Sequence, residues 1–102
     1  MPFRHTLLPV KFDWDPEKNK KLKEERNVSF EEVALLLGNG ILWKVSKHWN
    51  PKKYPNQRVF LIPIDNYIYA VPFVEEKDGT IFLKTIFQSR KLTKIYRAEM
   101  EK

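Results

Sequence analysis

The sequence predicts a two-layer α+β domain, with helices packed on an antiparallel sheet of about four or five strands. Three observations favour this class. One alternating segment precedes two helical segments, several alternating segments separated by turn residues follow, and a helical segment closes the chain. At 102 residues, 42% of them hydrophobic, the chain can bury one core and leaves little room for a second. We expect a single domain over 1–102, with 1–9 as an N-terminal extension.

A first strand and a polar helix are expected near the N-terminus. Residues 10–14 alternate apolar and polar side chains, as a half-buried strand does. Asp15 can cap the helix that follows, roughly 16–26, and Pro16 takes its first position, where a missing N–H does no harm. This helix is almost entirely polar, so it depends on packing against the rest of the domain.

The second helix, roughly 30–38, is expected to lie in the core. Ser29 and Glu32 form a capping box, in which each side chain bonds to the backbone N–H of the other residue. Apolar side chains then recur at helical spacing: Phe30, Val33, Ala34, Leu36 and Leu37.

Antiparallel strands and one more helix are expected after it. Asp65-Asn66 and Asp78-Gly79 are turn signals for two hairpins. Pro63 and Pro72 predict edges or bulges within the sheet. The final helix runs from Arg90 to about Met100, and all helices are expected on one sheet face, which leaves the other face to a partner or substrate. The strands are expected at 41–46, 58–64, 67–74 and 80–87.

Composition narrows the function classes. The 19 Lys and Arg residues outnumber the 13 Asp and Glu residues, which gives a net charge of +6. There is no Cys, and His5 and His48 are the only His residues, so thiol chemistry is excluded and a His-based zinc site is not expected. No apolar run approaches the ~20 residues of a membrane span. We expect a basic cytoplasmic protein without cofactor, metal or membrane partner.

The last strand and the last helix carry a basic pattern. Strand periodicity puts Lys84 on one face with Phe82 and Ile86. Helical spacing of four and three puts Arg90, Lys94 and Arg97 on one helix face. Convergence of these cations would form a phosphate-binding pocket. The alternatives are an ordinary solvated helix face and a Lys that blunts a strand edge.

The segment between the second and third strands adds cations interleaved with aromatic residues. Such a pattern can stack bases while the cations follow the phosphate backbone. The alternative is a Pro-containing loop anchored by aromatic rings, with lysines for solubility. The residues are Lys44, Lys47, His48, Trp49, Lys52, Lys53, Tyr54 and Arg58.

Metal-free RNA cleavage needs only such residue types. The ribose 2′-hydroxyl supplies the nucleophile, and the protein must accept one proton and stabilise charge on the phosphoryl oxygens. Arg and Lys can hold the phosphate, and Tyr or His can assist with protons.

Four short blocks resemble a known family. In order, they are 12–18 (FDWDPEK), 28–33 (VSFEEV), 56–58 (NQR) and 88–93 (QSRKLT). The chain resembles the BrnT-type toxins of bacterial type II toxin–antitoxin systems, within the RelE-like ribonuclease superfamily. Arg26-Asn27 stands where the family commonly has His-Gly, and Lys84 stands where it usually has Arg.

The resemblance implies a RelE-like fold and a metal-independent endoribonuclease that inhibits translation. It also implies an antitoxin partner, often a ribbon-helix-helix protein. The catalytic candidates are Arg58, Lys84, Arg90 and Arg97. The RNA-contacting candidates are Lys44, His48, Lys91, Lys94 and Tyr96. Two alternatives remain open: a non-catalytic nucleic-acid-binding module, and an interaction subunit whose apolar sheet face seats a partner.

Overall fold

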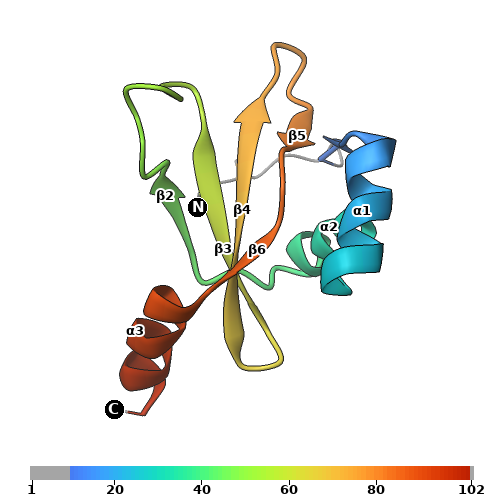
Figure 1. The fold of residues 1–102 in the computed structure, drawn as a ribbon. Coiled ribbons are helices and arrows are strands. Elements are labelled where there is room, and N and C mark those ends of the chain that lie inside the picture. Colours follow the sequence, from blue (N-terminus) through green and yellow to red (C-terminus); the bar gives the residue numbers. More distant parts are fainter. Residues whose placement is uncertain (1–9, 102) are drawn as a thin grey trace.

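The computed structural model describes residues 10–101 and is an α+β fold with three helices and a mixed sheet (Figure 1). The expected extension at 1–9 lies outside the described residues. The expected α+β class is confirmed. The elements are β1 (Phe12–Asp13), α1 (Pro16–Arg26), α2 (Phe30–Gly38), β2 (Lys44–Lys47), β3 (Arg58–Ile64), β4 (Tyr67–Glu75), β5 (Ile81–Leu83), β6 (Phe87–Ser89) and α3 (Arg90–Met100).

The sheet is built around β4. Its strand order is β1-β5-β4-β3-β2, and β6 pairs with β4 on the same edge as β5. The β3–β4 hairpin turns through Asp65 and Asn66, whose φ angles of 52° and 71° suit a tight two-residue turn. β1 runs parallel to β5, with Phe12 opposite Ile81, so the sheet is mixed and the prediction of a purely antiparallel sheet is wrong.

The single strand expected at 80–87 is divided into β5 and β6 in the structure, because the neighbouring strand β4 contains Pro72. The Pro72 carbonyl accepts a hydrogen bond from the Lys84 N–H at 2.8 Å, but proline has no N–H to return. The ladder therefore breaks at 84–86 and resumes in β6. Leu83 and Ile86 both enter the same core cluster, so the expected sharing of one face by Lys84 and Ile86 is wrong.

The two faces of the sheet carry separate cores. On the face that we call the α1/α2 face, alternate strand residues pack against α1 and α2: Phe60, Ile62, Val71 and Phe73 meet Leu22, Phe30, Val33 and Leu37. On the opposite face, the α3 face, the intervening residues pack against α3 and its neighbours: Val59, Leu61, Ile68 and Ala70 meet Trp43, Phe87, Leu92 and Tyr96. Figure 1 shows α3 well apart from α1 and α2. The expectation that all helices share one face is wrong, because β6 directs the chain onto the second face.

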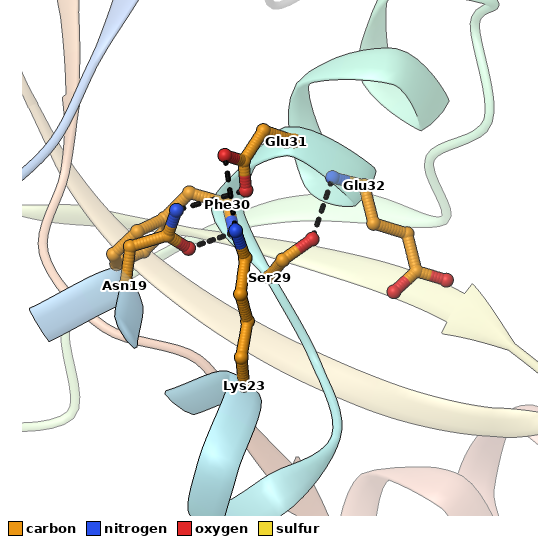
Figure 2. Close-up of polar contacts among 6 residues, drawn as sticks. All are labelled: Asn19, Lys23, Ser29, Phe30, Glu31 and Glu32. Atoms are coloured by element: carbon orange, nitrogen blue, oxygen red, sulfur yellow. Dashed lines mark hydrogen bonds and ion pairs between the residues drawn. The ribbon is translucent and has the colours of Figure 1, made fainter. Parts of the chain in front are cut away.

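Asn19 joins α1 to α2 (Figure 2). Its side chain is 5% exposed; Oδ1 accepts from the Phe30 N–H at 2.8 Å, and Nδ2 donates to the Glu31 carboxylate at 2.8 Å. Ser29 Oγ accepts from the Glu32 N–H at 3.1 Å. The Glu32 carboxylate points away from Ser29, so among the described residues only half of the expected capping box is formed.

We predict that Asn19→Ala lowers the free energy of unfolding by about 1–3 kcal/mol, because the buried Phe30 N–H loses its acceptor. Urea denaturation measures this loss. Asn39→Ala is the matched control, since its side chain is exposed and donates to the Leu35 carbonyl of the same helix, and we expect a change within about 0.5 kcal/mol. Equal losses in both variants would contradict the role of Asn19.

The contact between α1 and α2 is expected to make the stability of the domain depend on pH in the acidic range. The Asn19 amide, the Glu31 backbone N–H and then Lys23 hold the pKa of Glu31 below its ordinary value of 4.5. A carboxylate with a lowered pKa in the folded state stabilises fully above its unfolded pKa, and this contribution is lost as pH falls through the folded pKa. Glu31→Gln should therefore flatten the loss of stability below about pH 4.5. Glu32→Gln is the control, and identical pH curves for both variants would refute the assignment.

Candidate nucleic-acid interface

α3 is anchored to the sheet by hydrogen bonds at its first turn. Ser89 Oγ accepts from the Leu92 N–H at 3.2 Å, which caps the helix. Thr93, which is buried, accepts from the Ile68 N–H of β4 at 2.8 Å and donates to the Ser89 carbonyl at 2.6 Å. Leu92 and Tyr96 complete the packed side. The cations of α3 are therefore held at defined positions outside this contact.

Arg90, Lys91 and Lys94 form the exposed cationic part of α3. All three are exposed, and within residues 10–101 none of them takes part in an ion pair. Three cations within five positions, without acidic neighbours among them, give a local positive field suited to phosphates. These three residues are the part of the expected site that the structure brings together.

Arg97 is engaged with the β3–β4 hairpin. Its Nε donates to the Asn66 carbonyl at 3.1 Å, and its guanidinium carbon lies 4.7 Å from the centroid of the Tyr67 ring. It shares a helix face with Arg90 and Lys94 by spacing, as expected, but its side chain also anchors α3 to the turn.

Two other catalytic candidates, Lys84 and Arg58, contact aromatic rings of the sheet. The Lys84 amine is 5.2 Å from the centroid of the Phe82 ring. Lys84 bonds to Pro72 whereas Ser89, just before α3, pairs with Ile68, so about 13 Å of strand separates Lys84 from the start of the helix.

Arg58 lies on the α1/α2 face, since its guanidinium carbon is 5.1 Å from the centroid of the Phe73 ring. Its Nη2 is also 3.4 Å from Glu75 Oε1. Arg58 therefore lies on the face opposite α3 and does not converge with the cations of that helix. The convergence of Lys84 with Arg90 and Lys94 on one phosphate pocket stays a prediction.

The other RNA-contacting candidates are mostly packed. Lys44 Nζ is 3.7 Å from Glu99 Oε2 and lies 4.5 Å from the centroid of the Trp43 ring. Tyr96 is half-buried and meets Trp43 edge-on at 5.2 Å. His48 is 6% exposed, and its Nδ1 accepts from the Asn50 N–H at 3.0 Å. Tyr96 and His48 are thus packing residues here, because their rings face the protein.

Arg26 connects α1 to the break in the last strand. Its Nη1 donates to the Ile86 carbonyl at 2.6 Å. The next residue, Asn27, ends α1 in the left-handed conformation at φ 56°, which Asn tolerates better than most residues with a side chain. Arg26 and Asn27 therefore both have structural roles at the end of α1.

Trp49 belongs to the aromatic and basic loop that the sequence analysis singled out, but it is absent from the RNA-contacting candidates. It is 61% exposed and stacks on His48, with ring centroids 3.9 Å apart. The aromatic and basic pattern of the loop was the available signal. Which of its rings stays exposed depends on contacts with β6, far away in the sequence, and could not be derived from that pattern.

No family model, curated protein or solved structure matches this chain. Within residues 10–101, no group of three or more His, Asp or Glu side chains is arranged to hold a metal ion. None of the helices in this same range has the length and apolar character needed to span a membrane.

We predict that Arg97→Ala destabilises the domain by about 1 kcal/mol, because it removes the hydrogen bond to Asn66 and the contact with the Tyr67 ring. Chemical denaturation checks this value. Lys94→Ala, one turn earlier and exposed, should stay within about 0.5 kcal/mol of the parent chain. A fully stable Arg97→Ala chain would show that the hairpin contact contributes nothing.

Proposed function

We propose that this chain is the toxin of a type II toxin–antitoxin system, a cytoplasmic, metal-independent ribonuclease that inhibits translation and is neutralised by a cognate antitoxin. The order of a strand, two helices, an antiparallel meander and a final helix is the order expected of a RelE-like fold and supports the proposal. The observation that carries it is the exposed set of cations at the start of α3, none of which forms an ion pair with another of the residues 10–101, in a chain of net charge +6.

On this proposal Arg90 and Lys94 bind the scissile phosphate and stabilise charge on its oxygens while the ribose 2′-oxygen bonds to phosphorus and the bond from phosphorus to the 5′-oxygen breaks. The 2′-hydroxyl releases its proton to water, the leaving 5′-oxygen takes a proton from water, and a 2′,3′-cyclic phosphate and a 5′-hydroxyl result. Lys91 and the half-buried Arg97 bind neighbouring phosphates. Lys84 acts in cleavage after RNA displaces its contact with Phe82. Arg58, beside Phe73 on the opposite face, has no part in this site.

A second candidate is a non-catalytic nucleic-acid-binding module on the same surface. One observation favours it: Arg58, Lys84 and Arg97 each contact an aromatic ring of the protein, and Arg58 does so on the face opposite α3. Incubation of the chain with single-stranded RNA and a chelator separates the two candidates. Cleavage products support the ribonuclease, and intact RNA with a mobility shift supports the binder.

Expression of the chain alone is predicted to arrest bacterial growth, and Arg90→Ala with Lys94→Ala is predicted to relieve the arrest. Loss of two phosphate contacts should also weaken RNA binding at least about tenfold and make the salt dependence shallower. Growth curves and filter binding provide the measurements.

The matched control is Lys20→Ala with Lys21→Ala, which removes the same charge from exposed positions of α1, on the other side of the sheet. It should remain toxic. If the Arg90 and Lys94 double variant is folded, equally toxic and equally tight for RNA, the assignment of this surface is wrong.

A further inference from the structure

Trp49 is an exposed indole in a chain that packs its other indoles. Trp14 stacks on Phe30 beside the larger core, and Trp43 meets Tyr96 beside the smaller one. Trp49, by contrast, leaves 61% of its surface exposed. Burying an aromatic ring is strongly favourable, so an indole left at the surface is available to bind a ligand or partner.

The segment beneath Trp49 holds the ring in place. Its indole stacks on His48 at an interplanar angle of 27°, and the ring of Tyr54 lies 4.6 Å from that of His48. Asn50 closes the loop, because its N–H donates to His48 Nδ1 and its carbonyl accepts from the Tyr54 N–H at 3.0 Å. A ring held in this way loses little conformational entropy when a ligand stacks on it.

The charge around Trp49 selects an anionic ligand. The stretch from Val33 to Ile64 contains no Asp or Glu. An acidic ligand with flat, apolar rings satisfies both the charge and the exposed indole, and single-stranded nucleic acid has both properties. The cations of this stretch are Lys44, Lys47, Lys52, Lys53 and Arg58.

Trp49 also lies on the same side of the sheet as the cations of α3. It meets Phe87 edge-on, with ring centroids 5.3 Å apart and an interplanar angle of 86°. Phe87 precedes Arg90 by three residues and packs on the α3 face, so its Cα lies within about 11 Å of the first Cα of the helix. One strand of RNA can reach both.

We propose that Trp49 is a nucleobase-stacking site. One base of a single-stranded RNA stacks on the indole on the side away from His48, while Lys52 and Lys53 hold phosphates on one side and the exposed cations of α3 hold phosphates on the other. Within residues 10–101 the ring contacts of Trp49 are those with His48 and Phe87, neither of which accounts for its exposure. The site rests on the proposed function for its ligand, RNA, and adds the way in which a base is held.

The test measures binding of the full chain to a fluorescent 2′-O-methyl oligouridine of about ten nucleotides, by anisotropy with chelator present. This probe lacks the free 2′-hydroxyl and stays intact. Trp49→Leu keeps an apolar side chain beside Phe87 but removes the ring, and should weaken binding about 5- to 150-fold. Trp49→Phe restores a stacking face and should stay within about threefold of the parent chain. Leu35→Ala, an exposed apolar position on α2 (66% exposed), is the control and should bind as the parent does.

An abasic oligonucleotide of equal length completes the test. The parent chain should bind it more weakly than the oligouridine, and Trp49→Leu should no longer discriminate between the two. If Trp49→Leu binds the oligouridine like the parent, or loses affinity for both probes equally, base stacking is refuted, and the exposed ring would then suit a protein partner. If the parent binds no oligonucleotide, both this inference and the proposed function fail. If binding is tight and needs Arg90 and Lys94 but not Trp49, only this inference fails.

Discussion

The hydrogen bonding of β4 along both of its edges is the constraint on which the rest of the structure depends. One edge pairs with β3 from Tyr67 to Phe73, and the other is shared by β5, opposite Phe73 to Glu75, and β6, opposite Ile68 to Ala70. Because successive β4 side chains alternate between faces, this one strand contributes to both cores. It thereby determines which face receives α1 and α2, and which receives α3.

Pro72 determines where the last strand of the sheet is interrupted. The Lys84 amine lies beside Phe82, as regular strand alternation predicts, but the ladder breaks directly after Lys84, so this alternation does not continue to α3. Arg58 is held on the other face by Phe73. The cations therefore follow the surface at intervals, an arrangement that suits several phosphates of an extended strand better than a single phosphate in a pocket.

The sequence predicted what is decided locally and missed what depends on pairing between distant segments. The bounds of α1 and α2 and the start of α3 agree with the expected ones, because Asp15, Ser29 and Ser89 cap each helix within a few residues. The exposure of Arg90, Lys91 and Lys94 follows from helical spacing. The positions of Arg58 and Arg97 depend instead on Phe73 and Asn66, and no local pattern reveals the register that brings these partners together.

The two faces of the sheet therefore differ in what they can offer a ligand. The α1/α2 face is filled by the larger core, and the helix that covers it, α1, mixes lysines with glutamates along its exposed side. The α3 face combines exposed cations with the exposed ring of Trp49, and the segment that leads to this ring has no acidic residue. In the proposed function, RNA binds on the α3 face. On the proposed function, an antitoxin that prevents RNA binding must cover that same side, and the positive charge there favours acidic residues in the part of the partner that covers it.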